Sequence, residues 1–261
     1  MLILLGYILL GSVAGLTAGV FGLGGGIIIV PALIFTFSFL GFPNEVLTHM
    51  AVGTSLSTIM FTSLSAIYVH HKKSVINWVL ALKLSVGMIL GGLIGAYFAD
   101  IFSGELLQKL FALYSVTVAY QMWFSWRPSG SLTLPTKTGL ALLGTIIGMV
   151  SGLFGIAGGS LVVPILTLYR MKIKEAIATS SVTGFPIALS GTIGYLLTGL
   201  GNVSLPEYSV GYIYLPATLG IILSSTIFAK IGAKLVHRLD SNRLKKSFSI
   251  VLLLVAIKLF I

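Results

Sequence analysis

A glycine-rich segment occurs twice in this chain, and the two copies align without a gap. Residues 11–31 read GSVAGLTAGVFGLGGGIIIVP, and residues 144–164, 133 positions later, read GTIIGMVSGLFGIAGGSLVVP. A repeated segment that interrupts apolar helices with glycine is typical of membrane proteins built from two halves, where broken backbone can meet a substrate. The matched positions are Gly11/Gly144, Gly15/Gly148, Gly19/Gly152, Phe21/Phe154, Gly22/Gly155, Gly25/Gly158, Gly26/Gly159 and Pro31/Pro164.

The composition indicates a polytopic membrane protein. Of 261 residues, 56% are hydrophobic and 8% are charged, and the mean hydropathy is +1.06. A soluble domain of this length needs more polar surface. Several apolar runs approach or exceed the roughly 20 residues that cross a bilayer as a helix. The N-terminal residues 1–10 lack a basic start and a cleavage site, so we expect them to belong to the structure. The runs are 47–69, 77–99, 106–126, 177–200, 210–233 and 247–261.

Several functional classes are disfavoured. The chain has no cysteine, and its four histidines and six carboxylates are scattered, so we expect no metal site and no cofactor. The net charge of +10 comes from basic residues in short loops, which membrane topology explains better than nucleic-acid binding. No GxxxxGK[ST], HExxH or cysteine nucleophile is present, so we do not expect an enzyme.

The charges of the loops predict that the two halves have opposite orientations. In each pair of corresponding loops, one loop is rich in Lys and Arg and the other has none. Because basic loops face the cytoplasm, the pattern predicts an inverted-topology repeat in the inner (plasma) membrane, with both termini extracytoplasmic. The pairs are 40–46 with 169–175, 70–76 with 201–209, and 100–105 with 234–246.

Each glycine-rich segment is expected to form a helical hairpin. Residues 138–169 must leave and return on the same side, and as helix they measure about 48 Å, too short for two full spans. We therefore predict turns near residues 22–26 and 155–159. Each half then holds one broken hairpin and three full helices, giving an all-α fold with eight to ten membrane segments. The predicted division is residues 1–126 for repeat 1, 127–137 for a cytoplasmic linker and 138–261 for repeat 2.

Small residues also recur at a spacing of four. Such ridges let helix backbones approach closely in lipid, so helix packing is the favoured interpretation of these positions. The ridges are Gly11, Gly15 and Gly19; Gly144, Gly148 and Gly152; Gly87, Gly91 and Gly95; and Ser225, Ala229 and Ala233.

The two turns are the candidate substrate site. Five residues with three or four glycines do not continue a helix cheaply, and broken backbone at membrane depth needs a partner. The restarting helices would offer free N–H groups and the positive dipole end to an anion. Repeated hydroxyls just beyond each hairpin are expected either to contact this anion or to cap helices. The candidate substrate-binding residues are Gly22, Gly24, Gly25, Gly26, Thr54, Ser55, Gly155, Gly158, Gly159, Ser160, Thr179 and Ser180.

Other polar residues are weaker candidates. Lys83 lies near a predicted cytoplasmic edge, where its amine is expected to reach the interface, and His49 near an outer helix start is expected to be solvated. All six carboxylates fall at the edges of predicted spans, which argues against a buried carboxylate proton relay.

The chain resembles the TauE/SafE family of sulfite and organosulfonate exporters. The resemblance rests on the doubled glycine-rich segment ending in Val-Pro, followed by Ala-Val-Gly-Thr-Ser at 51–55 and Ala-Ile-Ala-Thr-Ser at 176–180, and covers essentially the whole chain. It implies transport of small sulfur-containing anions such as sulfite or sulfonates. Ala157 stands where the first copy has Gly24, so a symmetric site is not expected.

Three functions are weighed. The first is a secondary transporter that moves a small oxoanion by alternating access of the two halves. The second is an anion channel, or a transporter of another small anion or organic acid. The third is a membrane-embedded enzyme, for which the sequence contains none of the catalytic motifs named above. The sequence leaves open the exact substrate, the direction, a coupling ion such as H⁺ or Na⁺, and whether the chain forms a homo-oligomer.

Overall fold

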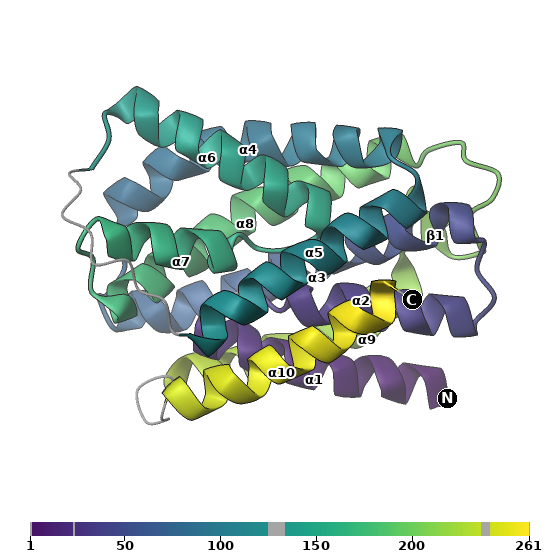
Figure 1. The fold of residues 1–261 in the computed structure, drawn as a ribbon, viewed down its shortest axis with the longest axis horizontal. Coiled ribbons are helices and arrows are strands. Elements are labelled where there is room, and N and C mark those ends of the chain that lie inside the picture. Colours follow the sequence, from purple (N-terminus) through teal and green to yellow (C-terminus); the bar gives the residue numbers. More distant parts are fainter. Residues whose placement is uncertain (1, 23, 125–133, 236–240, 261) are drawn as a thin grey trace.

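A computed structural model describes residues 2–22, 24–124, 134–235 and 241–260, which form ten α-helices and one short β-hairpin (Figure 1). The all-α prediction is confirmed. Parts of the predicted linker 127–137 and of loop 234–246 lie outside the described residues. The helices are α1 Leu2–Phe21, α2 Gly26–Phe39, α3 Asn44–Lys72, α4 Trp78–Ile101, α5 Gly104–Trp123, α6 Lys137–Phe154, α7 Gly159–Leu168, α8 Ile173–Thr198, α9 Leu215–Leu235 and α10 Ser241–Phe260; the strands are β1 Ser209–Val210 and β2 Ile213–Tyr214.

Six of the described helices are long and apolar enough to cross a membrane: α1, α3, α4, α6, α8 and α9. The sequence predicted six full spans, but with α5 and α10 in place of α1 and α6. The first arms of the two hairpins are α1, with 20 residues, and α6, with 18 residues. Each is long enough to cross the membrane by itself. The second arms, α2 and α7, are shorter apolar helices of 14 and 10 residues. Each hairpin is therefore a long arm followed by a short one.

Both predicted helix breaks are present. The chain leaves the helix after Phe21 and restarts at Gly26, and it leaves again after Phe154 and restarts at Gly159. Several of the intervening glycines have left-handed backbone, with φ of 71° at Gly24 and 70° at Gly158. Side chains with a Cβ adopt this conformation only at a cost, which explains why glycine interrupts these apolar helices.

The small-residue ridges pack one half of the chain onto the other. A Cβ added at Gly15 on α1 would lie 2.4 Å from the carbonyl oxygen of Ser225 on α9, and one at Gly148 on α6 would lie 2.5 Å from that of Met88 on α4. The helix-packing interpretation is confirmed for these positions. The long arm of each hairpin thus lies against a helix of the other half, while α3 contacts α8 and α5 contacts α10 (Figure 1). The inverted orientation in a membrane stays a prediction.

The start of the predicted run 210–233 is not helical. Residues 209–214 form an antiparallel hairpin that pairs Ser209 with Tyr214 and Val210 with Ile213, and α9 begins only at Leu215. Gly211 at φ 54° turns the chain between the strands. The apolar character of residues 210–214 predicts the beginning of a span, whereas in the structure these residues belong to the β-hairpin.

Candidate substrate site at the helix breaks

The structure brings the two helix breaks into contact. We call residues 22–26 the first tip and residues 155–159 the second tip. A Cβ added at Gly24 would lie 2.0 Å from the Cβ of Ala157, and one added at Gly26 would lie 2.2 Å from the carbonyl oxygen of Gly155. The tips are therefore packed backbone against backbone, and this contact requires the absence of side chains.

Each tip ends in a helix whose first N–H groups are uncapped. Gly25 is the N-cap residue of α2 and Gly158 that of α7, both in left-handed conformation, and neither helix start receives a side-chain hydrogen bond from the described residues. The first N–H groups of a helix have no acceptor within it and carry the positive end of its dipole. Two such ends near one point form a favourable environment for negative charge.

Two of the predicted serines hold the tip of the opposite half. The hydroxyl of Ser55 on α3 donates to the carbonyl oxygen of Gly155 at 2.8 Å, and that of Ser180 on α8 donates to the carbonyl oxygen of Gly22 at 3.4 Å. Both serines are fully buried. These side chains thus fix the positions of the tips relative to the two central helices.

Each of the two predicted threonines caps the start of a helix in the other half of the chain. Thr54 Oγ1 accepts a hydrogen bond from the backbone N–H of Tyr214 at 2.9 Å, directly before α9. Thr179 Oγ1 accepts one from the backbone N–H of Asn77 at 3.1 Å, directly before α4. Both threonines are fully buried. Of the two roles that the sequence left open, the structure supplies the partners for capping.

Ser160 lies on the second tip's helix and has a side-chain partner. Its hydroxyl, 7% exposed, is hydrogen-bonded to the hydroxyl of Tyr114 on α5. The Tyr114 ring stacks on Phe154, with 5.0 Å between ring centroids. Tyr114 therefore anchors the start of α7, and Ser160 is less free to meet a ligand than the N–H groups beside it.

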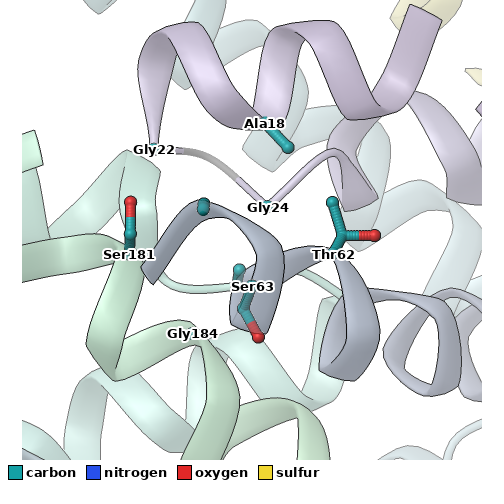
Figure 2. A pocket seen from close by; sticks show the side chains of 9 residues that line it. Ala18, Gly22, Gly24, Thr62, Ser63, Ser181 and Gly184 are labelled. Carbon is teal, nitrogen blue, oxygen red and sulfur yellow. The ribbon is translucent and has the colours of Figure 1, made fainter. Parts of the chain in front are cut away.

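A small pocket lies beside the first tip, where α1, α3 and α8 meet (Figure 2). Its free volume is about 10 Å³, close to what one water molecule requires. Two predicted residues, Gly22 and Gly24, line it; the remaining lining was missed. We call this space the tip pocket. It is lined by Ala18, Gly22, Gly24, Thr62, Ser63, Ala66, Ala157, Ser181 and Gly184.

The hydroxyls of the tip pocket bond to carbonyls of their own helices, and that of Thr62 is also hydrogen-bonded to the Ser225 hydroxyl on α9 at 3.0 Å. Ser63 donates to the carbonyl oxygen of Met60 at 3.0 Å, and Ser181 donates to that of Ile177 at 3.0 Å. An anion would be met by these hydroxyls only after they rotate, which exchanges one hydrogen bond worth about 1 kcal/mol for another. A sequence signal for this lining exists: hydroxyls recur along α3 well beyond Thr54, at Thr58 and Thr62.

None of the residues lining the tip pocket is ionisable, and no cluster of metal ligands occurs among the described residues. Lys83 is half-buried on α4 and is not part of the lining. The expectation for His49 is wrong: its side chain is 4% exposed and hydrogen-bonded rather than solvated. A ligand at the tips would therefore meet backbone dipoles and hydroxyls instead of side-chain charges.

The model of the sulfite exporter TauE/SafE family matches residues 7–259. The chain belongs to this family. It is 38% identical to a probable membrane transporter protein of Haemophilus influenzae over 97% of both chains. It is also 31% identical to one of Methanocaldococcus jannaschii, over 94% of this chain and 91% of that protein. No solved structure matches it. This TauE/SafE protein is thus a multi-pass membrane transporter of the plasma membrane.

Proposed function

We propose that this TauE/SafE protein is a secondary transporter for a small sulfur-containing oxoanion such as sulfite or a sulfonate. The observation that carries the proposal is the contact between the two tips, each of which leads directly into a helix with an uncapped N-terminus. Family membership supports the class of cargo. The tips and the tip pocket form the substrate site in this proposal.

The chemistry of the site favours an oxoanion. Backbone N–H groups and hydroxyls donate hydrogen bonds to several oxygens at once, and they avoid the cost of burying an ionised side chain. The N–H groups of residues 25–27 and 158–160 are the proposed donors. Ser55 and Ser180 hold the tips in place, while Thr54 fixes the start of α9 and Thr179 fixes the start of α4.

Transport requires movement, because the tip pocket holds about 10 Å³ in this structure. Sulfite is several times larger than the single water for which this space suffices. The two halves are interlocked through α1 on α9 and α6 on α4, so each hairpin can move with a helix of the other half. Alternating access in this proposal is a separation of the tips, first toward one side of the membrane and then toward the other.

Uptake into liposomes containing the purified protein tests the proposal, with sulfite, thiosulfate, sulfoacetate and a nitrate control. We expect saturable uptake of a sulfur oxoanion, accelerated by the same anion on the opposite side. Gly25→Leu and Gly158→Leu should abolish uptake, because a Cβ at either position meets neighbouring atoms at 2.7 or 2.8 Å. The matched control is Gly6→Leu, where a Cβ meets nothing within 4 Å.

Each result has a defined meaning. Wild-type uptake in both folded tip variants would refute the site. Uptake that never saturates and is not accelerated from the opposite side would show a channel instead of a carrier. No uptake of any sulfur anion by folded protein would refute the cargo.

A further inference from the structure

A buried imidazole near the predicted extracytoplasmic end of α3 has one nitrogen available for a proton. His49 Nε2 lies 2.9 Å from the carbonyl oxygen of Ala99 and 3.1 Å from that of Phe102. Carbonyl oxygens only accept hydrogen bonds, so Nε2 carries the hydrogen. Nδ1 is then the basic nitrogen of the neutral ring, and it is buried without a hydrogen-bond partner among the described residues.

Three surrounding features favour a positive charge on this ring. The carbonyls that His49 contacts belong to the C-terminal end of α4, where the helix dipole is negative. The ring stacks on Tyr212 with 5.2 Å between centroids, and an aromatic face stabilises a cation. The Tyr212 hydroxyl in turn donates to Asp100 Oδ1 at 3.0 Å. The ring thus faces the end of a helix, an aromatic ring and, through Tyr212, a carboxylate.

Asp100 is the carboxylate that reaches His49 through Tyr212. Burial raises the pKa of Tyr212, so its hydroxyl remains protonated at neutral pH and keeps donating to Asp100. Glu105 is paired with Lys109 on its own helix. The ionisable groups on the elements around this end of α3 include Glu45 on α3, Asp100 on α4, Glu105 and Lys109 on α5, Tyr195 on α8, Tyr212 and Tyr214 on the β-hairpin, and Lys258 on α10.

The residues around His49 are connected to the second tip by hydrogen bonds. The backbone N–H of Tyr212 donates to the carbonyl oxygen of Tyr195 at 3.1 Å, and the Tyr195 hydroxyl donates to that of Leu153 at 3.3 Å, next to the end of α6. On α3 itself, Ser55 follows His49 by less than two turns and holds the Gly155 carbonyl. Two sets of contacts therefore link the surroundings of the imidazole to the second tip.

We propose that His49 is the proton-binding site that couples H⁺ to anion transport. A proton from extracytoplasmic water binds Nδ1, the ring gains one positive charge, and no other covalent bond changes. The new N–H has no acceptor among the residues that the structure describes. Protonation consequently favours an arrangement in which the His49 ring turns toward Asp100 or water and the β1–β2 hairpin separates from α3. The inference rests on the proposed function.

The experiment follows sulfoacetate uptake and lumenal pH together in liposomes, at external values between about pH 6 and 8, where histidine titrates. Sulfoacetate remains ionised over this range, so the probe itself does not carry the proton. Wild-type uptake should rise as the external solution is acidified and should acidify the lumen. His49→Gln keeps a donor for the two carbonyls but cannot be protonated. It should retain sulfoacetate exchange at equal pH on both sides and lose the proton flux.

The controls separate this inference from the proposed function. His71→Gln, an exposed residue against Trp78, should behave as wild type. Unchanged proton flux and pH dependence in His49→Gln would overturn the inference. If His49→Gln fails to fold, Asp100→Asn is tested in its place. The pH of half-maximal uptake should then fall below that of the wild type, and an unchanged value overturns the inference. Absence of sulfoacetate exchange at equal pH in the wild type would contradict the proposed function instead.

Discussion

The two sides of the tip contact have the same scaffold but different linings. In the alignment that pairs Thr54 with Thr179, the pocket-lining Ser181 corresponds to Leu56, and Gly184 corresponds to Ile59. Leu56 and Ile59 are fully buried. The Cδ1 atom of Ile59 lies 2.8 Å from the position that a Cβ added at Gly26 would occupy. One side is thus small and hydroxylated, and the other is filled by hydrocarbon.

This difference indicates that the repeated residues build the framework, whereas the lining of the tip pocket arises where the two copies diverge. Capping by Thr54 and Thr179 and tip support by Ser55 and Ser180 occur in both halves. The tip pocket beside α1, in contrast, contains Thr62, Ser63, Ser181 and Gly184, whose equivalents are the apolar residues Ile187, Ala188, Leu56 and Ile59. We infer that the hydroxylated side is where the anion enters in the state shown and that the apolar side is closed.

The largest expected effect comes from making the open side resemble the filled side. Gly184→Ile places the residue found at the equivalent position into the tip pocket, and anion uptake should be abolished. Gly184→Ala should reduce uptake partially, because its Cβ would lie 3.2 Å from the Cβ of Ala157. Uptake is measured beside thermal unfolding. Gly6→Ile is the matched control, and unimpaired uptake in folded Gly184→Ile would contradict the account.

The converse change opens the filled side. Leu56→Ala removes a fully buried side chain that packs against Gly191, and should cost about 2–5 kcal/mol of stability. Because the apolar barrier is then thinner, we expect a nonsaturable leak of anions in addition to carrier-mediated uptake. Leakage of a preloaded anion from liposomes measures it. Leu113→Ala, exposed on α5, serves as the control; a tight Leu56→Ala protein would refute the barrier.

A smaller effect is expected at the hydroxyls of the tip pocket. Ser181→Ala removes one donor, and the apparent affinity for the anion should fall about three- to tenfold, in line with roughly 1 kcal/mol per hydrogen bond. Ser85→Ala is the matched control, because Ser85 donates to the carbonyl of Ala81 in the same manner but lies outside the tip pocket. Equal affinities in the two variants would remove Ser181 from the site.

The smallest effect on transport is expected at the capping threonines. Thr54→Val and Thr179→Val each leave a backbone N–H without its acceptor, at a cost of about 1–3 kcal/mol in unfolding free energy. Affinity for the anion should change less than in Ser181→Ala. Chemical denaturation and uptake kinetics are compared for each variant. A large loss of affinity without loss of stability would show that the threonines contact the anion directly.

The framework could be predicted from the sequence because local rules determine it. The dense glycine runs at residues 22–26 and 155–159 interrupt the helices, and the spacing of Gly11, Gly15 and Gly19 allows close helix packing; both expectations are confirmed. The spans were assigned less well, because α1 and α6 were treated as parts of hairpins although each is long enough to cross.

The pocket could not be predicted in the same way. Hydroxyls occur on nearly every turn of α3 and on the first turns of α8, and which of them face the tip depends on the rotation of each helix. Tertiary packing sets that rotation. His49 was missed for a similar reason: its burial depends on the hairpin residue Tyr212, which lies far away in the sequence and stacks on the ring.

Equilibrium binding of radiolabelled sulfite and sulfoacetate to the purified protein tests the central claim most directly, since it asks whether the tips hold an anion without requiring a complete transport cycle. The account predicts saturable binding of one of these anions to wild type and to Gly6→Ile, and loss of binding in folded Gly184→Ile. Equal binding by wild type and Gly184→Ile would place the anion elsewhere in the protein and contradict the account.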